Sequence, residues 1–290
     1  MFQTIAFGDS LKVTPLPSTA IEHEIFCTDP TVPCDERNLV WKAAELFRKK
    51  TGNRQKFSID LRKEVPAGAG LGGGSGNAAT MLWAANKICG EDRPDSDLLE
   101  WSGDIGSDIS FFFSGGTAYC TGRGEIVEDM PPALPSGYPI VLVKPALPLS
   151  TAAVYGKLDV SRCSDVDPEE LKQRFYQEAL MASSERWALR HPTPHGRHGR
   201  RPNLFLSSPP PSLSCCRKSV TEHPPQDLCV NDLEIPAFEE MPVLAKVSLY
   251  SSSACLSVSG ALTQFCAHHL VKTSNWNSSP LPRQKMEITG

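Results

Sequence analysis

Glycine dominates one short stretch of the chain and predicts an anion-binding loop. The stretch reads Pro66, Ala67, Gly68, Ala69, Gly70, Leu71, Gly72, Gly73, Gly74, Ser75 and Gly76. Glycine adopts positive φ values and lets the backbone approach a ligand closely. Where such a loop leads into a helix, its N–H groups and the helix dipole attract phosphate. We therefore predict a phosphate-binding loop, in which Ser75 caps the helix or offers its hydroxyl to a phosphate and Asn77 helps to orient that group.

The loop differs from two common nucleotide-binding motifs. No Lys-Ser or Lys-Thr pair follows the last glycine, which excludes a Walker A loop. Glu91 and Asp92 come too early to be the acidic residue of a dinucleotide-binding fingerprint. A glycine-rich linker is the plain alternative, and the strand and helix patterns on either side argue against it.

A second candidate for chemistry is Asp108, which lies within Gly106–Phe113. It stands between small residues and a strand-like apolar run, Phe111–Phe113. A carboxylate at the edge of a buried region costs free energy unless it is used. Asp108 is therefore a candidate catalytic group, and a helix-cap or turn aspartate is an equally good interpretation of the sequence.

Hydrophobic periodicity predicts the elements that position these residues. Alternation predicts strands, and apolar spacing of three and four residues predicts helices. The expected strands are Phe2–Val13, Phe57–Leu61, Ile140–Val143 and a strand within Gly115–Glu125 that ends in a tight turn. The expected helices are Asp35–Lys50, capped by Asp35 and followed by Gly52, then Asn77–Cys89 and Pro168–Ala179.

Charge and hydropathy narrow the class of partner. The 290 residues carry a formal net charge of -4, which does not favour binding to nucleic acid or to an anionic membrane surface. No apolar run is long enough to span a bilayer. Cys266, His268 and His269 match no structural zinc pattern, so no protein-held metal is predicted. The oligomeric state stays open.

The second half of the chain changes character twice. Residues 182–225 are rich in proline, serine and arginine and show neither helical nor strand periodicity, so we predict a disordered insert. It is either a basic, proline-rich linker or docking tail, or a segment without a role. Residues 226–246 recover globular character, and residues 247–290 predict a serine-rich, disordered tail.

Several segments together carry a family resemblance. The spacing Pro66-x3-Gly70-Leu71-Gly72 resembles the GHMP kinase superfamily. The longer phrase Gly70–Thr80 is similar to the 4-diphosphocytidyl-2-C-methyl-D-erythritol kinase family of the non-mevalonate isoprenoid pathway. Three further segments agree, namely Phe2–Asp9, Gly106–Phe112 and Val230–Glu234. Ala118–Glu125 is similar to the plant, plastid-targeted form, and the resemblance covers residues 1–178 and 226–245.

The resemblance implies an α+β, GHMP-kinase-like fold of two domains with the active site between them. The N-terminal domain would be largely present and the C-terminal domain incomplete. The implied divisions are an ATP-binding domain at 1–140 without its first strand, the start of the C-terminal domain at 141–181, the insert at 182–225, a C-terminal fragment at 226–246 and the tail at 247–290.

The resemblance also implies a chemistry. ATP phosphates would lie on residues 66–76 with Mg²⁺ bound to them, and Asp108 would orient or deprotonate the 2-hydroxyl of a cytidine-diphosphate-linked methylerythritol. Ser110 replaces the proline of the family's motif, and Gly76 stands where the family usually has serine. The implied partner is a small-molecule substrate, and the implied location is the plastid.

Two alternatives remain open at this point. The family's lysine-bearing strand is expected before Phe2, and its Gly-Ser-Gly-Ser-type loop is expected after residue 245; neither is found in the sequence. The chain is therefore either an active kinase or a truncated or mis-spliced, inactive remnant of one. Another GHMP kinase, of the homoserine or mevalonate type, is a further alternative. Val230–Glu234 and the triple glycine at 72–74 argue against it.

Overall fold

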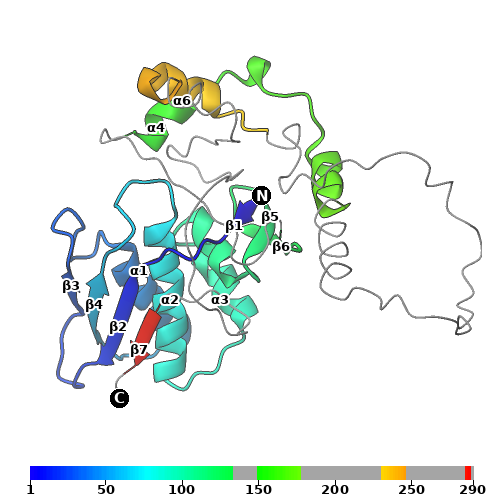
Figure 1. Ribbon diagram of the computed structural model, residues 1–290. Coiled ribbons are helices and arrows are strands. Elements are labelled where there is room, and N and C mark those ends of the chain that lie inside the picture. The colour runs from blue at the N-terminus through cyan, green and yellow to red at the C-terminus, as the bar shows by residue number, and fades with distance from the viewer. Residues whose placement is uncertain (133–148, 178–229, 246–284, 289–290) are drawn as a thin grey trace, which may run out of the picture.

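Of the two sheets in the described part of the chain, the larger has the strand order β3-β4-β2-β7 (Figure 1). β4 (Phe57–Arg62) pairs antiparallel with β2 (Ser10–Pro15) and parallel with β3 (Glu24–Cys27). Alternate residues of β4 are buried, as expected for a strand with one face on a core. The strand predicted at Phe57–Leu61 is thereby confirmed.

This computed structural model describes residues 1–132, 149–177, 230–245 and 285–288. The strand predicted at Ile140–Val143, the division predicted at residues 140–141 and the insert predicted at 182–225 lie outside these ranges. The described residues combine helices and sheets, so the α+β class is confirmed, whereas the domain boundaries stay predictions.

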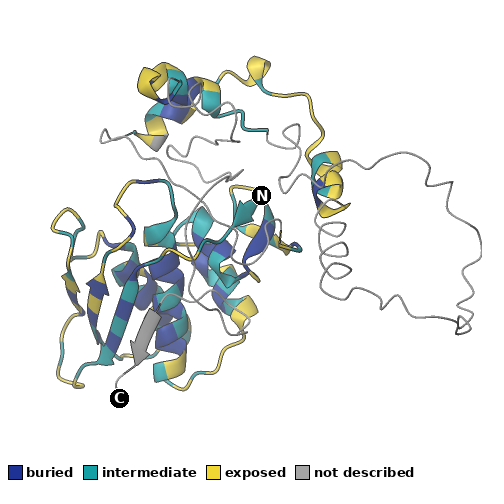
Figure 2. Ribbon diagram, in the orientation of Figure 1, coloured by how far each residue is buried: buried dark blue, intermediate teal, exposed yellow. Residues whose placement is uncertain are grey.

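Two helices, α1 (Leu39–Thr51) and α2 (Gly73–Ile88), pack together and bury the sheet's inner face (Figure 2). Small residues on α2 let the helices approach closely, and the sheet supplies larger side chains. The core centre is made of Leu11, Val13, Val40, Ala43, Ala44, Phe47, Phe57, Ile59, Ala78, Met81, Leu82 and Ala85. Removing a fully buried aromatic side chain such as Phe47 costs about 3–5 kcal/mol of stability.

The ends of α1 correct one prediction and confirm another. Asn38, not Asp35, is the N-cap, because the Asn38 side chain accepts a hydrogen bond from the Val40 N–H at 3.0 Å. The Asp35 carboxylate is bound instead by the Arg37 side chain. Gly52 ends the helix with a φ of 75°, the left-handed conformation that glycine favours.

The strand predicted over Phe2–Val13 is two strands in two sheets. β1 (Phe2–Gln3) pairs antiparallel with β5 (Thr117–Thr121), and β5 pairs with β6 (Ile126–Asp129) to form the smaller sheet. The alternation fails at Phe7, which is 38% exposed. The chain then crosses to the larger sheet and resumes as β2.

The β5–β6 pair confirms the strand and tight turn predicted within Gly115–Glu125. Gly122 and Gly124 in that turn have φ values of 70° and 120°. The 3-10 helix η1 (Ser107–Phe113) contacts both α2 and β6, and α3 (Asp95–Ser102) packs against η1 and α2.

A smaller apolar cluster lies outside the main core. Val154 on α4 (Thr151–Gly156) packs with Ala237, Met241 and Leu244 on and after α6 (Glu234–Glu240). The helix predicted at Pro168–Ala179 is confirmed over residues 168–177, and a short 3-10 helix, η2 (Val160–Arg162), precedes it.

The predicted disordered tail is wrong for four residues. β7 (Lys285–Ile288) pairs parallel with β2 at Ser10–Val13. Sequence composition missed it because a strand this short needs only the open edge of another strand as its template. The rest of 247–290 lies outside the described residues.

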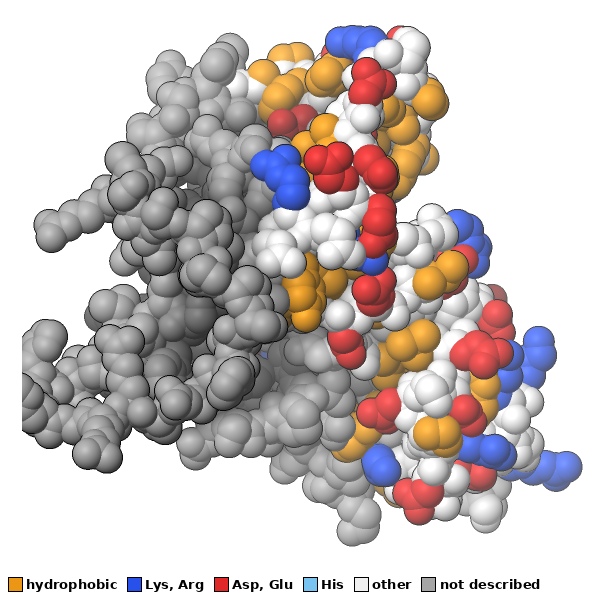
Figure 3. All heavy atoms as spheres, turned by 90° about the vertical axis from the view of Figure 1, so that its right-hand side faces the viewer, with side chains coloured by type: hydrophobic (Ala, Val, Ile, Leu, Met, Phe, Trp, Pro, Cys, Tyr) orange, Lys and Arg blue, Asp and Glu red, His pale blue; other side chains and the backbone are white. Residues whose placement is uncertain are grey.

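The described surface mixes charges of both signs. On the face shown in Figure 3, acidic and basic side chains are interspersed with apolar ones instead of gathering by type. Within the described ranges, no helix is long and apolar enough to cross a membrane.

Candidate active site

The glycine stretch forms a loop between β4 and α2, as predicted. Gly68, Gly70 and Gly72 have φ values of 65°, 68° and 67°, a region that costs other residues roughly 1–2 kcal/mol. Pro66, Ala67 and Gly68 are exposed. The start of the loop is therefore open to solvent, whereas the residues directly before the helix are buried or half-buried.

Helix α2 begins at Gly73, four residues earlier than the predicted start at Asn77. Glycines 73, 74 and 76 are thus helical, which their low helix propensity concealed in the sequence. The N-cap is Gly72, whose position has no side chain to cap the helix, and no acidic residue lies in the first turn. The first N–H groups of a helix have no acceptor within it, so this turn is suited to bind an anion.

The structure rules out one of the two predicted roles of Ser75 and gives Asn77 a partner that was not predicted. Ser75 lies inside the first turn and is not the N-cap, which leaves its hydroxyl as a predicted phosphate contact. Asn77 is 1% exposed and its Nδ2 donates to Asp9 at 2.9 Å. The Asn77 Oδ1 is buried without a hydrogen-bond partner among the described residues.

Two charged residues beside the loop were missed by the sequence analysis. Lys63 and Asp9 form an ion pair whose side chains are 7% and 0% exposed. A Cβ atom at Gly73 would lie 3.3 Å from the Lys63 ammonium nitrogen. The available signal was a lysine at the end of a buried strand directly before the loop, since a buried lysine needs a counter-charge.

Asp108 lies in the first turn of η1, and the turn of the β5–β6 pair approaches it closely. A Cβ atom at Gly124 would lie 3.4 Å from the Asp108 Oδ1. Burial raises the pKa of Asp108, and among the described residues no donor or cation opposes this effect. A carboxylate in such surroundings is a stronger base than an exposed one.

The strand-like run predicted at Phe111–Phe113 is the end of η1. Phe111 packs against Phe2 and Phe112, with ring centroids 5.2 Å apart in each pair. Ser110, which replaces the proline of the resembled motif, is fully buried and its Oγ lies 2.9 Å from the Ser102 Oγ. This hydrogen bond ties η1 to α3, and proline has no group to form it.

The loop and the Asp108 helix meet at one contact. A Cβ atom at Gly72 would lie 2.9 Å from the Phe112 ring, so only glycine lets α2 begin here. Ile109, directly after Asp108, belongs to the same core as Ala78 and Leu82 of α2. The last residue of the loop therefore packs against the short helix that bears Asp108.

The described residues hold no group of three or more His, Cys, Asp or Glu side chains that could bind a metal ion. Mg²⁺ in kinases is typically bound through substrate phosphates with one or two carboxylates. The first turn of α2, which lacks acidic side chains, is compatible with phosphates that carry such an ion. Cys266, His268 and His269 lie outside the described residues.

Comparison with known proteins assigns the class. Residues 38–116 match the family described as GHMP kinases N terminal domain. The match runs from the N-cap of α1 through the glycine loop and α2 to η1. The region that holds the loop and Asp108 is thus similar to a GHMP kinase N-terminal domain.

More particular relatives share one printed name, 4-diphosphocytidyl-2-C-methyl-D-erythritol kinase. The chain is 43% identical over 248 residues to the chloroplastic protein of Mentha piperita, covering 85% of this chain and 50% of that protein. It is 44% identical over 186 residues to the protein of Protochlamydia amoebophila (strain UWE25), covering 63% and 62%. The chain spans about half the length of the plant relatives it matches.

A solved structure supports the fold. A 4-(cytidine 5'-diphospho)-2C-methyl-D-erythritol kinase superposes with a TM-score of 0.54 at 24% identity, covering 86% of this chain and 73% of that one. The predicted resemblance to this kinase family within the GHMP superfamily is confirmed.

Proposed function

We propose that this protein is an ATP-dependent kinase that phosphorylates the 2-hydroxyl of 4-diphosphocytidyl-2-C-methyl-D-erythritol. The observation that carries the proposal is the contact between Gly72 and Phe112, because it joins the glycine loop at the start of α2 to the short helix that bears Asp108. A kinase of this kind needs a phosphate site and a base for the acceptor hydroxyl side by side.

The glycine loop and the first turn of α2 would hold the ATP phosphates. Positive-φ glycines expose the backbone, and the helix dipole adds a partial positive charge. Mg²⁺, when bound to the phosphates, would neutralise part of their charge. Because the first turn has no acidic side chain, nothing in it repels an anion.

Asp108 would act on the acceptor. The hydroxyl oxygen attacks the γ-phosphorus, its proton passes to the Asp108 carboxylate, and the bond between the γ-phosphorus and the bridging oxygen breaks to release ADP. Burial raises the pKa of Asp108, which makes the carboxylate a better proton acceptor than an exposed aspartate.

The substrate and the location rest on the relatives. Their names give the same cytidine-diphosphate-linked substrate in plants and bacteria, and four plant relatives are named chloroplastic, one of them also chromoplastic. We extend both to this chain, which makes it a plastid enzyme acting on a small molecule.

The test is a phosphotransfer assay with ATP, Mg²⁺ and 4-diphosphocytidyl-2-C-methyl-D-erythritol, run beside homoserine and mevalonate. We expect transfer to the cytidylyl substrate alone. Transfer to another acceptor would overturn the substrate assignment. ATP binding by calorimetry without transfer to any acceptor would overturn the catalytic assignment and leave a nucleotide-binding protein.

A further inference from the structure

Asp9 lies in the crossing between β1 and β2 and is 1% exposed. Its carboxylate accepts four hydrogen bonds from two distant parts of the chain. The Oδ1 accepts the backbone N–H groups of Glu64 at 2.7 Å and Val65 at 2.8 Å. The Oδ2 accepts the Lys63 ammonium and, at 2.9 Å, the Asn77 Nδ2.

The carboxylate therefore joins the two flanks of the glycine loop. Glu64 and Val65 lead into the loop, whereas Asn77 lies in α2 just after it. Between them the chain runs through glycines with positive φ and an exposed stretch. A carboxylate that joins both flanks limits the shapes this flexible segment can take.

Charge gives Asp9 a second effect. Lys63 is buried beside the first turn of α2, 3.3 Å from a Cβ position on Gly73. Its ammonium lies at the positive end of the helix dipole, where an unpaired cation is unfavourable. Asp9 neutralises this charge and thereby stabilises the buried lysine beside the first turn of α2.

We propose that Asp9 is a positioning residue that fixes the phosphate-binding loop in its ATP-binding shape by holding Lys63, the loop's first amides and Asn77. The inference rests on the proposed function for the identity of the ligand. It does not make Asp9 a catalytic residue, because the carboxylate is fully occupied within the protein.

Asp9→Asn is the informative substitution. An asparagine Oδ1 still accepts from Glu64 and Val65, but its NH₂ group faces two donors, Lys63 and Asn77, and the counter-charge is lost. Asp60→Asn is the matched control, because Asp60 lies on β4 of the same sheet with an exposed side chain.

Two measurements on the full chain test the proposal. Amide hydrogen exchange of residues 63–77, without nucleotide, measures how well the loop is ordered. Calorimetric titration with ATP and Mg²⁺ measures the affinity for ATP. In Asp9→Asn we expect exchange in this segment to accelerate about tenfold while α1 and β5 keep their protection. We expect the ATP Kd, and the KM for ATP, to rise roughly tenfold with a smaller change in kcat.

The outcomes separate the proposals. Equal exchange and equal ATP affinity in Asp9→Asn and Asp60→Asn would overturn the role of Asp9. Faster exchange spread evenly over α1, β5 and the loop would also overturn it, because Asp9 would then only stabilise the fold. Absence of ATP binding in the unsubstituted protein would overturn the proposed function, while the exchange data would still decide on Asp9.

A double substitution keeps the test open if Asp9→Asn does not fold. Lys63→Met together with Asp9→Asn leaves no unpaired buried charge. If Asp9 acts partly through Lys63, Asp9→Asn has a smaller effect on loop exchange in the Lys63→Met background than alone. Strictly additive effects would contradict the coupling through Lys63.

Discussion

Asp108 is set apart from the other carboxylates by what surrounds it. Asp35 and Asp104 are bound by Arg37 and Lys50 at the surface, and Asp9 is held by buried donors. Asp108 is shielded from water by the β5–β6 turn, and burial raises its pKa without an opposing cation among the described residues. Such a group is available for proton transfer in a way that the paired carboxylates are not.

Replacing Asp108 by asparagine tests its role as base. We expect Asp108→Asn to lower kcat by about 10²–10⁴-fold, because general base catalysis contributes that much, and to leave the thermal unfolding temperature unchanged or slightly raised. Asp104→Asn is the control, since its carboxylate is exposed and only pairs with Lys50. Equal turnover in both variants would show that Asp108 is not the base.

The raised pKa of Asp108 sets the direction of the pH profile. The base must be ionised, so kcat/KM is expected to rise with pH through an inflection above 3.8, the ordinary value for aspartate. The measurement is kcat/KM with both substrates between pH 4.5 and 8, over the range where the fold is intact. A profile that is flat down to pH 4.5 would contradict the prediction.

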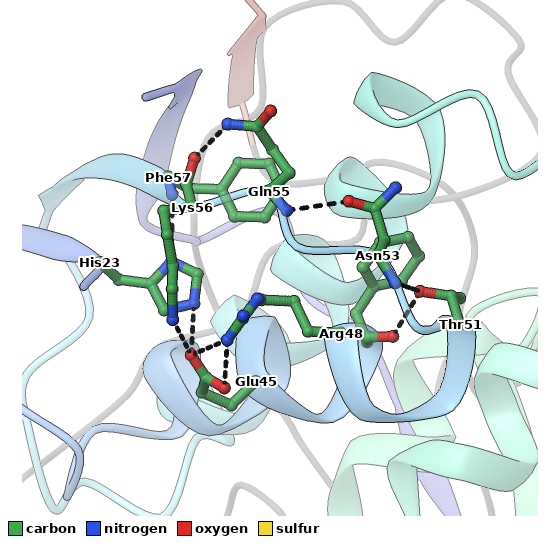
Figure 4. A network of polar contacts seen from close by, with 9 residues as sticks. His23, Glu45, Arg48, Thr51, Asn53, Gln55, Lys56 and Phe57 are labelled. Atoms are coloured by element: carbon green, nitrogen blue, oxygen red, sulfur yellow. Dashed lines mark hydrogen bonds and ion pairs between the residues drawn. The ribbon is translucent and has the colours of Figure 1, made fainter. Parts of the chain in front are cut away.

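His23 gives a separate prediction about stability. Its Nδ1 accepts the Phe57 N–H at 3.0 Å, which places the proton on Nε2, 3.0 Å from Glu45 (Figure 4). Burial lowers the pKa of His23 to about 4; Glu45 opposes this effect, while Lys56 and Arg48 reinforce it.

The sign follows from which state binds the proton. The unfolded chain protonates His23 near pH 6.5 and the folded chain only near 4, so stability falls as pH drops between these values. We expect a loss of about 2 kcal/mol from this group between pH 6.5 and 5. Urea unfolding at several pH values should show a shallower dependence in His23→Gln, and parallel curves would refute the assignment.

At the residue scale, the sequence was sufficient to propose groups that can be recognised from their neighbours in the chain. A run of glycines, or a carboxylate among small residues, stands out in the sequence without knowledge of which distant residue it contacts. Asp9 and Lys63 were missed because their meaning lies in a pair separated by 54 positions. Hydrophobic periodicity carries no information about which buried charges meet.

At the scale of elements, the proposed phosphate site depends most on the first turn of α2. Gly68 and Gly72 have nearly equal φ values, 65° and 67°, but differ in their surroundings. A Cβ atom at Gly68 meets nothing within 4 Å, whereas one at Gly72 would lie 2.9 Å from Phe112. A side chain at Gly68 would thus meet backbone strain alone, whereas one at Gly72 would meet both backbone strain and steric overlap.

Alanine at these glycines is a matched pair of variants. Gly68→Ala should cost about 1–2 kcal/mol of stability through its backbone conformation alone. Gly72→Ala should cost about 1–3 kcal/mol more, because the methyl group displaces Phe112 and with it η1. Chemical denaturation measures the difference, and turnover should fall further in Gly72→Ala. Equal destabilisation of both variants would contradict the contact between the loop and η1.

Elements were predicted best where local and tertiary preferences agree. β4 and the C-terminal end of α1 at Gly52 follow directly from alternation and helix-end signals. The start of α2 was placed late because its first turn is glycine-rich, and η1 was mistaken for a strand because three phenylalanines favour one. In both cases packing against the core outweighed propensity.

At the scale of the whole molecule, a segment near the C-terminus pairs with β2 near the N-terminus. β2 lies between β4 and β7, and its pairing with β7 is parallel over four residues, Ser10–Val13. These residues include the core positions Leu11 and Val13 and follow directly after Asp9. The C-terminal strand β7 therefore covers the edge of β2, the strand that begins directly after Asp9.

Removing this strand tests whether it contributes to the stability of the larger sheet. Deletion of residues 285–290 would leave the backbone groups of β2 unpaired along one edge, and such an edge both loses hydrogen bonds and invites association with other chains. We expect a loss of roughly 1–3 kcal/mol, faster amide exchange at residues 10–13, and aggregation that rises with protein concentration. Deletion of residues 289–290 alone is the control, because it leaves β7 intact. Thermal unfolding and light scattering measure both variants, and an unchanged unfolding temperature with unchanged protection at residues 10–13 would mean that β7 adds nothing to the sheet.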